Sequence, residues 1–370
     1  MIYLDKKGFD VPLSRLGFGG MRFNDHNEGV NAVRYAFENG ITYFDTAPGY
    51  CRDQSENIYG EAFKHIPRNK IIVSSKSGIW KDKTAHALLE RVKTSIQRMG
   101  VDYLDVLHIW CIKDKPMFRR IITKGGPYEG AIKAKESGLV KHIFFSSHAN
   151  NEVNKEILKH ELFEGITIGF NILNSSARLE TLQSAKKNKL ITVSMNPLAG
   201  GMFTRFKNFF TFLKQESTAS LIETALHYNL SHKELDIVLS GMSSVKEVEE
   251  NIAAVNRFKE EHNPHLKAKS IEDALANLNG SFCTLCNYCI PCPVNIPIPT
   301  YMNVIDIKKV SGEQEEKQFY YWHKDRNSFQ GIEADKCTEC GVCEEKCTQH
   351  LPIIDRLKEV SDDFHRFGIK

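Results

Sequence analysis

The sequence predicts an α/β protein: a closed (β/α)8 barrel, the TIM barrel, followed by a small cysteine-rich module. Between residue 13 and about 256, eight short apolar segments alternate with eight helical patterns. The chain has 370 residues, enough for such a barrel and a second, smaller unit. Eight of the ten cysteines fall in two short runs behind the alternating region. These three observations define two structural parts.

The strand candidates are short runs of β-branched, aromatic and other apolar residues, which favour a buried pleated sheet. The eight runs are Leu13–Phe18, Thr42–Phe44, Ile71–Ser74, Tyr103–Ile109, His142–Phe145, Gly165–Phe170, Ile191–Met195 and Ile237–Leu239. They predict one strand per βα unit.

Helical patterns lie between these runs, with apolar residues three or four positions apart, as in Leu88, Val92 and Ile96. Glycine marks several expected helix ends, as at Gly100 and Gly138, because it adopts the left-handed cap conformation. The expected helices span residues 28–39, 55–65, 84–99, 128–137, 151–159, 177–188, 217–228 and 245–256.

The number and size of these units match a TIM barrel, although a doubly wound open sheet is an alternative with the same alternation. In a barrel, active sites form where the strands end, on the loops that lead into the helices. The residues directly after each strand candidate are therefore the first place to look for chemistry.

The composition excludes several classes of function. The net charge is +3, and no stripe of Lys and Arg with interleaved aromatics is present, so we expect no nucleic-acid partner. No run of 18 apolar residues occurs, and the N-terminus lacks the apolar core of a signal peptide. We therefore expect a cytoplasmic protein without membrane association.

The two cysteine runs have the spacing of metal ligands. They read Cys283-x2-Cys286-x2-Cys289-x2-Cys292 and Cys337-x2-Cys340-x2-Cys343-x3-Cys347. In a large chain without an export signal, such runs indicate metal binding rather than disulfides. The iron–sulfur pattern of bacterial ferredoxins is C-x2-C-x2-C-x3-C-P, and its fourth cysteine binds the other cluster. The second run has Thr348 instead of the proline; the first keeps Pro293 but has a shorter last gap.

Three thiolates at this spacing can surround one 4Fe-4S cluster, and the fourth ligand must come from elsewhere. This reasoning predicts two clusters, one held by Cys283, Cys286, Cys289 and Cys347, the other by Cys337, Cys340, Cys343 and Cys292. A pair of zinc sites is the alternative, but zinc ribbons use separated cysteine pairs. We expect the barrel over residues 1–262, a helical connector over 263–280 and a ferredoxin-like 4Fe-4S domain over 281–370.

Three polar residues follow the second and third strand candidates: Asp45, Tyr50 and Lys76. A phenol is a poor acid at neutral pH because its pKa lies near 10. A nearby Lys ammonium stabilises the phenolate and lowers that pKa, and an Asp paired with the Lys fixes its position. Each residue also has an ordinary alternative, since Asp often caps a helix and Lys is often solvated.

These residues belong to a longer pattern that resembles the aldo-keto reductase family, specifically its branch with a C-terminal ferredoxin-like extension. The resemblance covers roughly residues 1–256. It rests on Phe44-Asp45-Thr46-Ala47, Tyr50, Ser55-Glu56, Gly60, Ser75-Lys76, Val101-Asp102-Tyr103-Leu104-Asp105, Pro197-Leu198, Ser240-Gly241-Met242-Ser243 and Glu250-Asn251.

The resemblance implies NAD(P)H-dependent reduction of a carbonyl group in a small organic substrate. Tyr50 would be the acid, Lys76 would lower its pKa, and Asp45 would hold Lys76. The residues that would bind the nucleotide are Ser146, Ser147, Pro197, Leu198, Gly241, Ser243, Glu250 and Asn251.

The sequence departs from the family pattern where the fourth catalytic residue, a histidine, is expected. Trp110 occupies that position. The nearest histidine is His108, two residues earlier, which would face the same side of the strand as Trp110. Because an indole offers only an N–H donor, His108 is the catalytic candidate, with a packed or substrate-lining histidine as the alternative. Cys51 and Cys111 stand beside this region; we expect buried small side chains, with a site thiol or a cluster ligand as the alternative.

Two further departures concern the nucleotide. Met195 stands where the family stacks an aromatic ring on the nicotinamide, and Ser147 replaces the usual Asn. Between Gly241 and Glu250 the only basic residue is Lys246, whereas the family often holds the 2′-phosphate of NADP with basic side chains there.

Three functional hypotheses remain open from the sequence. The first is an oxidoreductase that exchanges electrons with a small organic substrate through the two clusters, with NAD(P)H or with a ferredoxin or flavodoxin as donor. The second is an electron-transfer subunit whose barrel is not catalytic. The third is a lyase-type enzyme that uses the Tyr–Lys pair for proton transfer without moving a hydride.

Overall fold

The computed structural model describes residues 1–175, 177–214, 220–259, 282–325, 329 and 332–368. It divides into two compact units, each described here by itself. One unit is the barrel, and the other combines the C-terminal region with the segment from Ala199 that carries α8 and η3. The expected connector over 263–280, and its boundary with the barrel, lie outside the described residues.

Eight parallel strands close into a barrel in the order β10-β3-β4-β5-β6-β7-β8-β9. The TIM-barrel prediction is confirmed, and the open-sheet alternative is excluded because β10 pairs with β3 and closes the circle. The strands are β3 (Leu16–Gly19), β4 (Tyr43–Asp45), β5 (Ile72–Ser77), β6 (Leu104–Ile112), β7 (Val140–Ser147), β8 (Gly165–Gly169), β9 (Ile191–Met195) and β10 (Ile237–Gly241).

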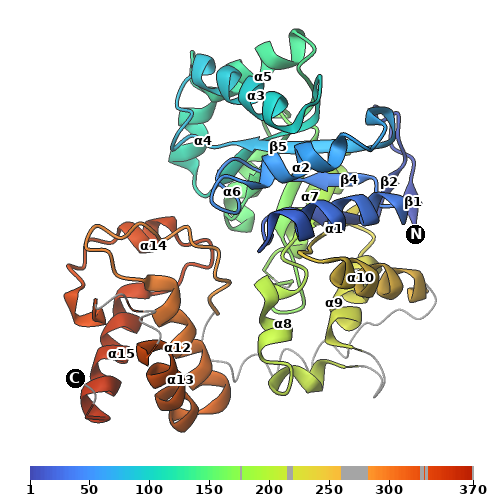
Figure 1. The fold of residues 1–370 in the computed structure, drawn as a ribbon. Coiled ribbons are helices and arrows are strands. Elements are labelled where there is room, and N and C mark those ends of the chain that lie inside the picture. The colour runs from blue at the N-terminus through green and yellow to red at the C-terminus, as the bar shows by residue number, and fades with distance from the viewer. Residues whose placement is uncertain (176, 215–219, 260–281, 326–328, 330–331, 369–370) are drawn as a thin grey trace. The chain divides into compact units, whose positions relative to one another are not determined.

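Helices connect successive strands on the outside of the barrel, as the alternating pattern predicts (Figure 1). Ser, Thr, Asp or Asn caps several of them; Thr84, for example, accepts the Ala87 N–H at the start of α3. The helices are α1 (His26–Glu38), α2 (Ser55–Phe63), α3 (Ala85–Met99), α4 (Lys115–Ile122), α5 (Pro127–Glu136), α6 (Asn151–Leu158), α7 (Leu179–Lys187), α9 (Leu221–Ser231) and α10 (Val245–Arg257), with the 3-10 turn η1 (Arg68–Lys70).

The first strand candidate divides into two elements. Leu13–Ser14 forms β2, which pairs antiparallel with β1 (Tyr3–Leu4), and only Leu16–Gly19 enters the barrel. The Ser14 hydroxyl donates to the Leu16 carbonyl at 2.7 Å, so this side chain satisfies a backbone acceptor at the break. A continuous apolar run does not reveal such a break.

Helix α4 was not predicted, although its signals are present. Asp114 accepts the Met117 N–H at 2.6 Å as the helix cap, and Pro116 stands in the first turn. Phe118 and Ile121, three residues apart, are buried. The helix is short, so its periodicity spans only two turns and is easily missed.

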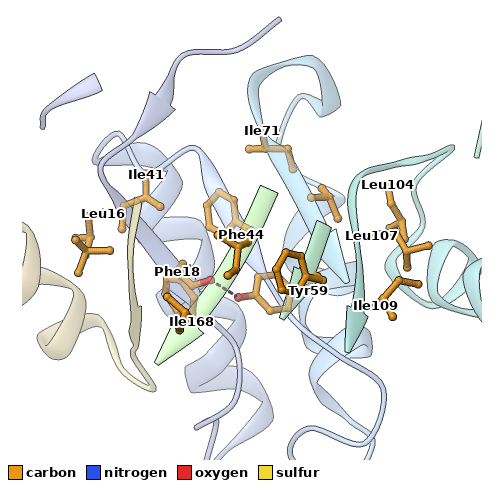
Figure 2. Packing of buried hydrophobic residues seen from close by; sticks show 14 of the residues in the cluster. Leu16, Phe18, Ile41, Phe44, Tyr59, Ile71, Leu104, Leu107, Ile109 and Ile168 are labelled. Atoms are coloured by element: carbon orange, nitrogen blue, oxygen red, sulfur yellow. Dashed lines mark hydrogen bonds between the residues drawn. The ribbon is translucent and has the colours of Figure 1, made fainter. Parts of the chain in front are cut away.

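Apolar side chains from strands and helices fill the barrel unit (Figure 2). Phe18 of β3, Phe44 of β4 and Tyr59 of α2 pack together, with ring centroids 6.0–6.2 Å apart. The Tyr59 hydroxyl donates to the Phe18 carbonyl at 3.1 Å, which satisfies its polar end. A Cβ at position 20 would lie 2.3 Å from the Tyr59 ring, so glycine is required where α2 meets the end of β3.

The second unit is mainly helical. Its elements are η2 (Ala199–Gly201), α8 (Met202–Arg205), η3 (Phe209–Leu213), α12 (Ile298–Ser311), α13 (Glu313–Asp325), η4 (Ala334–Lys336), α14 (Val342–Lys346) and α15 (Ile353–Arg366). Helix α12 packs against both α13 and α15 (Figure 1), around a core that includes Tyr301, Ile305, Leu357 and Val360. In the described part of the chain, no helix has the length and apolar character needed to cross a bilayer.

Candidate functional site

The register of β4, β5 and β6 brings the predicted catalytic residues together. Asp45, the last residue of β4, pairs with Ser74 of β5, and Lys76 pairs with His108 of β6. Ser74 and Lys76 are two residues apart, so they share one face of β5. Both contact Asp45, whereas Ser75 points to the other face and donates to Glu56 on α2 at 2.8 Å.

Lys76 and Asp45 form a buried ion pair. The Lys76 Nζ donates to Asp45 Oδ2 and also to the Thr46 carbonyl at 2.7 Å, while the Ser74 hydroxyl donates to Asp45 Oδ1 at 2.8 Å. Burial lowers the pKa of Lys76, and the charge of Asp45 partly offsets that effect. The carboxylate therefore both fixes the amine in place and favours its ammonium form.

Tyr50 lies directly beside this pair. The Lys76 Nζ is 5.3 Å from the centre of the Tyr50 ring, and Tyr50 is partly exposed while Lys76 is buried. The site therefore presents a phenol toward the barrel mouth with a cation held behind it. This arrangement can stabilise a phenolate and so make the phenol a better acid.

Two tryptophans lie next to Tyr50. The Trp110 ring makes an edge contact with the Tyr50 ring at 5.4 Å between centroids, and Trp80 packs on Trp110 at 4.9 Å. Trp110 precedes a bulge in β6, where the register with β7 shifts and Cys111 has a φ of 61°. Trp80 was missed at the sequence level because it lies three residues beyond the strand end, outside any recognised pattern.

His108 does not lie at the mouth. It is fully buried in the barrel; Nδ1 is 3.2 Å from the Ser74 hydroxyl and Nε2 is 2.7 Å from the Thr167 hydroxyl. Burial lowers the pKa of His108 well below its usual value, and the charge of Lys76 adds to this effect. Because Ser74 donates to Asp45, it accepts from His108, which assigns the Nδ1–H tautomer. Direct contact between His108 and a substrate is not supported; the ring supports Asp45 through Ser74.

The serines expected at the nicotinamide carboxamide are buried and already hydrogen-bonded. The Ser147 hydroxyl donates to Asn154 Oδ1 at 2.5 Å and accepts the Ala149 N–H at 3.1 Å. The Ser146 hydroxyl accepts the Cys111 N–H at 2.8 Å, a bond that follows from the bulge in β6. In this arrangement the Ser147 hydroxyl proton is used within the chain, whereas the Ser146 hydroxyl acts as an acceptor in its bond with Cys111.

The residues expected at the far end of the nucleotide are also largely engaged within the chain. The N–H and hydroxyl of Ser243 both donate to Glu247, at 2.6 and 2.9 Å, and the buried Asn251 accepts from Ser240 at 2.8 Å. Gly241 and Glu250 are exposed. Pro197 and Leu198 begin two residues after the end of β9, the first buried and the second half-buried.

The two isolated cysteines lie where the sequence places them, near Tyr50 and Trp110. Cys51 is half-buried and its thiol contacts the Gly20 carbonyl at 3.4 Å; burial raises its pKa. Cys111 is buried, with 2% of its surface exposed. A raised pKa disfavours the reactive thiolate, so Cys51 has the character of a small buried side chain rather than of a nucleophile.

The two cysteine runs adopt the same backbone conformation. In each run, the residues two and four positions after the first cysteine are left-handed: Leu285 and Asn287 in the first, Glu339 and Gly341 in the second. In each run, the first of these residues donates its N–H to the first cysteine sulfur at 3.4 Å. The loops are therefore curled so that backbone N–H groups point at sulfur, as cluster ligation requires.

The repeat continues into the following helices. Asn295 and His350, each three residues after the fourth cysteine of its run, are again left-handed, and Pro297 and Pro352 then begin α12 and α15. The second unit is thus a pseudo-symmetric pair of cysteine loops, each leading into a helix. This symmetry is only partly visible in the sequence, because the two runs differ in their last gap.

The cysteines lie in two groups, and each group includes the fourth cysteine of the other run. The first group consists of Cys283, Cys286, Cys289 and Cys347. Burial is the main cause that raises the pKa of Cys283 and of Cys289, and the nearby thiols of Cys286 and Cys347 raise both pKa values further. Cys292, Cys337, Cys340 and Cys343 together line one small cavity that is partly open to solvent.

The walls of that cavity are otherwise apolar, with Val294, Ile296, Ile298, Ile354 and Leu357 between the sulfurs. Among the described residues, no three His, Cys, Asp or Glu side chains converge on a position for a single metal ion. Sulfurs spread around a cavity fit a polyatomic cluster, which occupies more room than one ion.

Comparison with known proteins agrees with both parts of the chain. The aldo/keto reductase family matches residues 15–271, and the 4Fe-4S dicluster domain matches residues 282–352. The L-galactose dehydrogenase of Arabidopsis thaliana is 28% identical, covering 67% of this chain and 86% of that protein. The NADH-specific methylglyoxal reductase of Escherichia coli is 24% identical, covering 67% of this chain and 91% of that protein.

Solved structures show the same architecture. The holo form of the aldo-keto reductase AKR11C1 from Bacillus halodurans superposes with a TM-score of 0.62 at 25% identity, covering 74% of this chain and 96% of that one. An aldo-keto reductase from Klebsiella pneumoniae in complex with NADPH has a TM-score of 0.59 at 18% identity, covering 71% and 92% of the two chains; this similarity concerns the fold. The chain therefore belongs to the aldo/keto reductase family of oxidoreductases and carries a 4Fe-4S dicluster domain at its C-terminal end.

Proposed function

We propose that the barrel reduces a carbonyl group of a small organic substrate, or oxidises the corresponding alcohol, with Tyr50 as the proton donor or acceptor. The observation that carries this proposal is the Lys76 ammonium, which is paired with the buried Asp45 and held 5.3 Å from the centre of the Tyr50 ring. Reduction of a carbonyl to an alcohol takes up two electrons, one from each reduced cluster, and two protons, one on the carbon, from water, and one on the oxygen. Tyr50 supplies the proton that arrives on the substrate oxygen.

The surrounding residues prepare Tyr50 for this step. Lys76 stabilises the phenolate that remains after proton transfer, and Asp45 keeps the amine charged and in place. The Ser74 hydroxyl, which also contacts His108, donates to Asp45 Oδ1, and Lys76 donates to Asp45 Oδ2. Trp80 and Trp110 provide an aromatic wall next to the phenol.

We propose that the reducing equivalents are exchanged through two 4Fe-4S clusters, held by the two sets of four cysteines. Such clusters transfer electrons one at a time. The curled cysteine loops and the apolar cavity around Cys292, Cys337, Cys340 and Cys343 fit this role. A ferredoxin- or flavodoxin-type donor suits that chemistry. NAD(P)H, which the family resemblance implies, would lie near Ser147, Ser243 and Asn251, whose side chains are hydrogen-bonded within the chain in this structure.

The names of the relatives suggest which substrates to try. One is an L-galactose dehydrogenase and another a methylglyoxal reductase, so sugars and small oxo-aldehydes are reasonable first probes. In this chain the Tyr50 phenol lies beside an aromatic wall formed by Trp80 and Trp110. We therefore propose a small polar carbonyl or hydroxyl compound as the substrate class.

The test is the Tyr50→Phe variant, prepared anaerobically with its clusters. We expect turnover of any accepted carbonyl substrate to fall by at least about 100-fold, because general acid catalysis typically contributes that much. Iron content and cluster absorbance should equal those of the unchanged protein. Full activity in this variant would refute the assignment of Tyr50. If no variant or condition gives turnover while a partner protein is still reduced, the barrel is not catalytic.

A further inference from the structure

The loop that carries Tyr50 is held in an unusual backbone conformation. Gly49 has a φ of 85°, and the three residues after Tyr50, namely Cys51, Arg52 and Asp53, have φ values of 53°, 55° and 68°. The left-handed region disfavours L-residues other than glycine, so three in a row form a strained turn. Such a turn persists only where neighbouring groups hold it.

One arginine from a distant helix holds this turn. Arg98, in the last turn of α3, donates from Nη1 to Asp53 Oδ1 at 2.9 Å and from Nη2 to Asp53 Oδ2 at 2.8 Å. Asp53 in turn accepts the N–H of Gly49 at 2.8 Å, which closes the loop around Tyr50. The paired contact fixes the orientation of the carboxylate as well as its position.

The same arginine reaches the strand that carries Lys76. Arg98 Nη1 donates to Glu56 Oε2 at 3.2 Å, and Glu56 Oε1 accepts from the Ser75 hydroxyl at 2.8 Å. Glu56 is 1% exposed, so its charge requires a partner, and Ser75 directly precedes Lys76. Arg98 thus connects the Tyr50 loop with strand β5.

The backbone of Arg98 is fixed by helix packing. A Cβ at Gly60 of α2 would lie 2.3 Å from the Arg98 carbonyl, so this glycine allows the two helices to approach closely. Glu56 lies one turn earlier on α2. The backbone of Arg98 on α3 and its partner Glu56 on α2 therefore belong to two closely packed helices.

We propose that Arg98 is a positioning residue: by binding Asp53 and Glu56 together, it sets where the Tyr50 ring lies relative to the Lys76 ammonium. It does not itself contact the reacting atoms. This role rests on the proposed function in one respect: the proposed function says what the Tyr50 proton is used for. The Arg98–Asp53 pair is partly exposed and adds little stability, so its effect should appear in Tyr50 rather than in folding.

Loss of Arg98 has a defined consequence. Arg98 donates a hydrogen bond to Glu56. The negative charge of Glu56 also raises the pKa of Lys76. Without Arg98, the strained turn can relax and let the Tyr50 ring move away from Lys76, and the negative charge of Glu56 is no longer compensated. Both changes weaken the stabilisation of the Tyr50 phenolate.

The experiment titrates Tyr50 directly in the full-length, cluster-loaded protein, with 3-fluorotyrosine placed at position 50 and followed by fluorine NMR. We expect the pKa of Tyr50 to rise by about one unit in Arg98→Ala, the low end of the effect of a nearby opposite charge. Arg98→Lys should give a smaller rise, because an amine cannot bind both carboxylates in the forked geometry. Asp53→Asn keeps an acceptor for Gly49 and should raise the pKa without changing the unfolding midpoint.

A matched control lies on the same helix. Arg91, seven residues earlier, contacts Asp82, which accepts from Ser77 of β5; its side chain is 24% exposed against 26% for Arg98. Arg91→Ala should leave the Tyr50 titration unchanged. An equal shift in Arg91→Ala, or no shift in both Asp53→Asn and Arg98→Lys, would overturn the proposal. Because the titration needs no substrate, either outcome is independent of whether Tyr50→Phe loses activity.

Discussion

At the scale of single residues, the central feature is a charge pair that water does not reach. Lys76 and Asp45 are each 2% exposed, and each is the main counter-charge of the other. Their positions were predictable, because both stand at strand ends, where a barrel places its active site. The contacts of Ser74 with Asp45 and His108, and the Arg98–Asp53 pair, were not predictable, since they join residues 29 to 45 positions apart.

The ion pair can be tested by removing its members singly and together. We expect Lys76→Met and Asp45→Asn each to destabilise the barrel by about 3–5 kcal/mol, since each leaves a buried group without its partner. The double variant should cost clearly less than the sum of the two. Urea unfolding at pH 7, followed by circular dichroism, measures the three values. Additive costs would show that the two side chains do not interact in the folded state.

At the scale of elements, strand alternation decides which residues meet. In β5, Ser74 and Lys76 face Asp45 inside the barrel, while Ser75 faces Glu56 on α2, so one strand serves both the site and its support. The sequence predicts this alternation, but not the bulge after Trp110 in β6. That bulge depends on tertiary contacts such as the Cys111–Ser146 hydrogen bond, which no local pattern reveals.

Glu164, the residue directly before β8, should make the stability of the fold depend on pH. Burial alone would raise the pKa of Glu164, but hydrogen bonds from His142, Lys135 and the Ile143 N–H outweigh it and lower the pKa to about 2. A carboxylate with a lowered pKa stabilises the fold at pH values above 4.5, the pKa of the group in the unfolded chain. This contribution is lost as the pH falls toward 2, the pKa in the folded protein.

Glu164→Gln should therefore lower stability at pH 7 and reduce its decline between pH 4.5 and 3. The side chain is 40% exposed, so solvent screening keeps the effect modest. The measurement is the difference in urea midpoint between the two proteins across this range. A difference that stays constant with pH would contradict the assigned ion pairs.

At the scale of the whole molecule, the chain combines two units that the sequence separates only in part. The barrel and the cysteine module were predicted from strand number and cysteine spacing. The sequence did not show that the segment following Leu198 belongs with the cysteine module. Arg205 of α8 donates to the Cys283 carbonyl at 3.0 Å and to Asn303 at 2.6 Å, contacts that join residues 78 and 98 positions apart.

This division predicts the effect of removing iron. Helices α12 and α15 begin a few residues after cysteine ligands, and a unit of this size depends strongly on bound metal for its stability. We expect iron chelation to reduce hydrogen-exchange protection of both helices and of α8 together, while β4, β5 and β6 keep theirs. Retained protection of α8 alone would contradict its assignment to the second unit.

The proposed function depends on electron exchange between the clusters and a substrate in the barrel. The most direct measurement is an anaerobic one: reduce the clusters with dithionite, remove excess reductant, add methylglyoxal or another accepted carbonyl, and follow visible cluster absorbance. We expect the clusters to reoxidise as the alcohol forms in the unchanged protein, and to stay reduced in Tyr50→Phe. Clusters that stay reduced in the unchanged protein, while substrate is consumed with NADH or NADPH, would contradict the account.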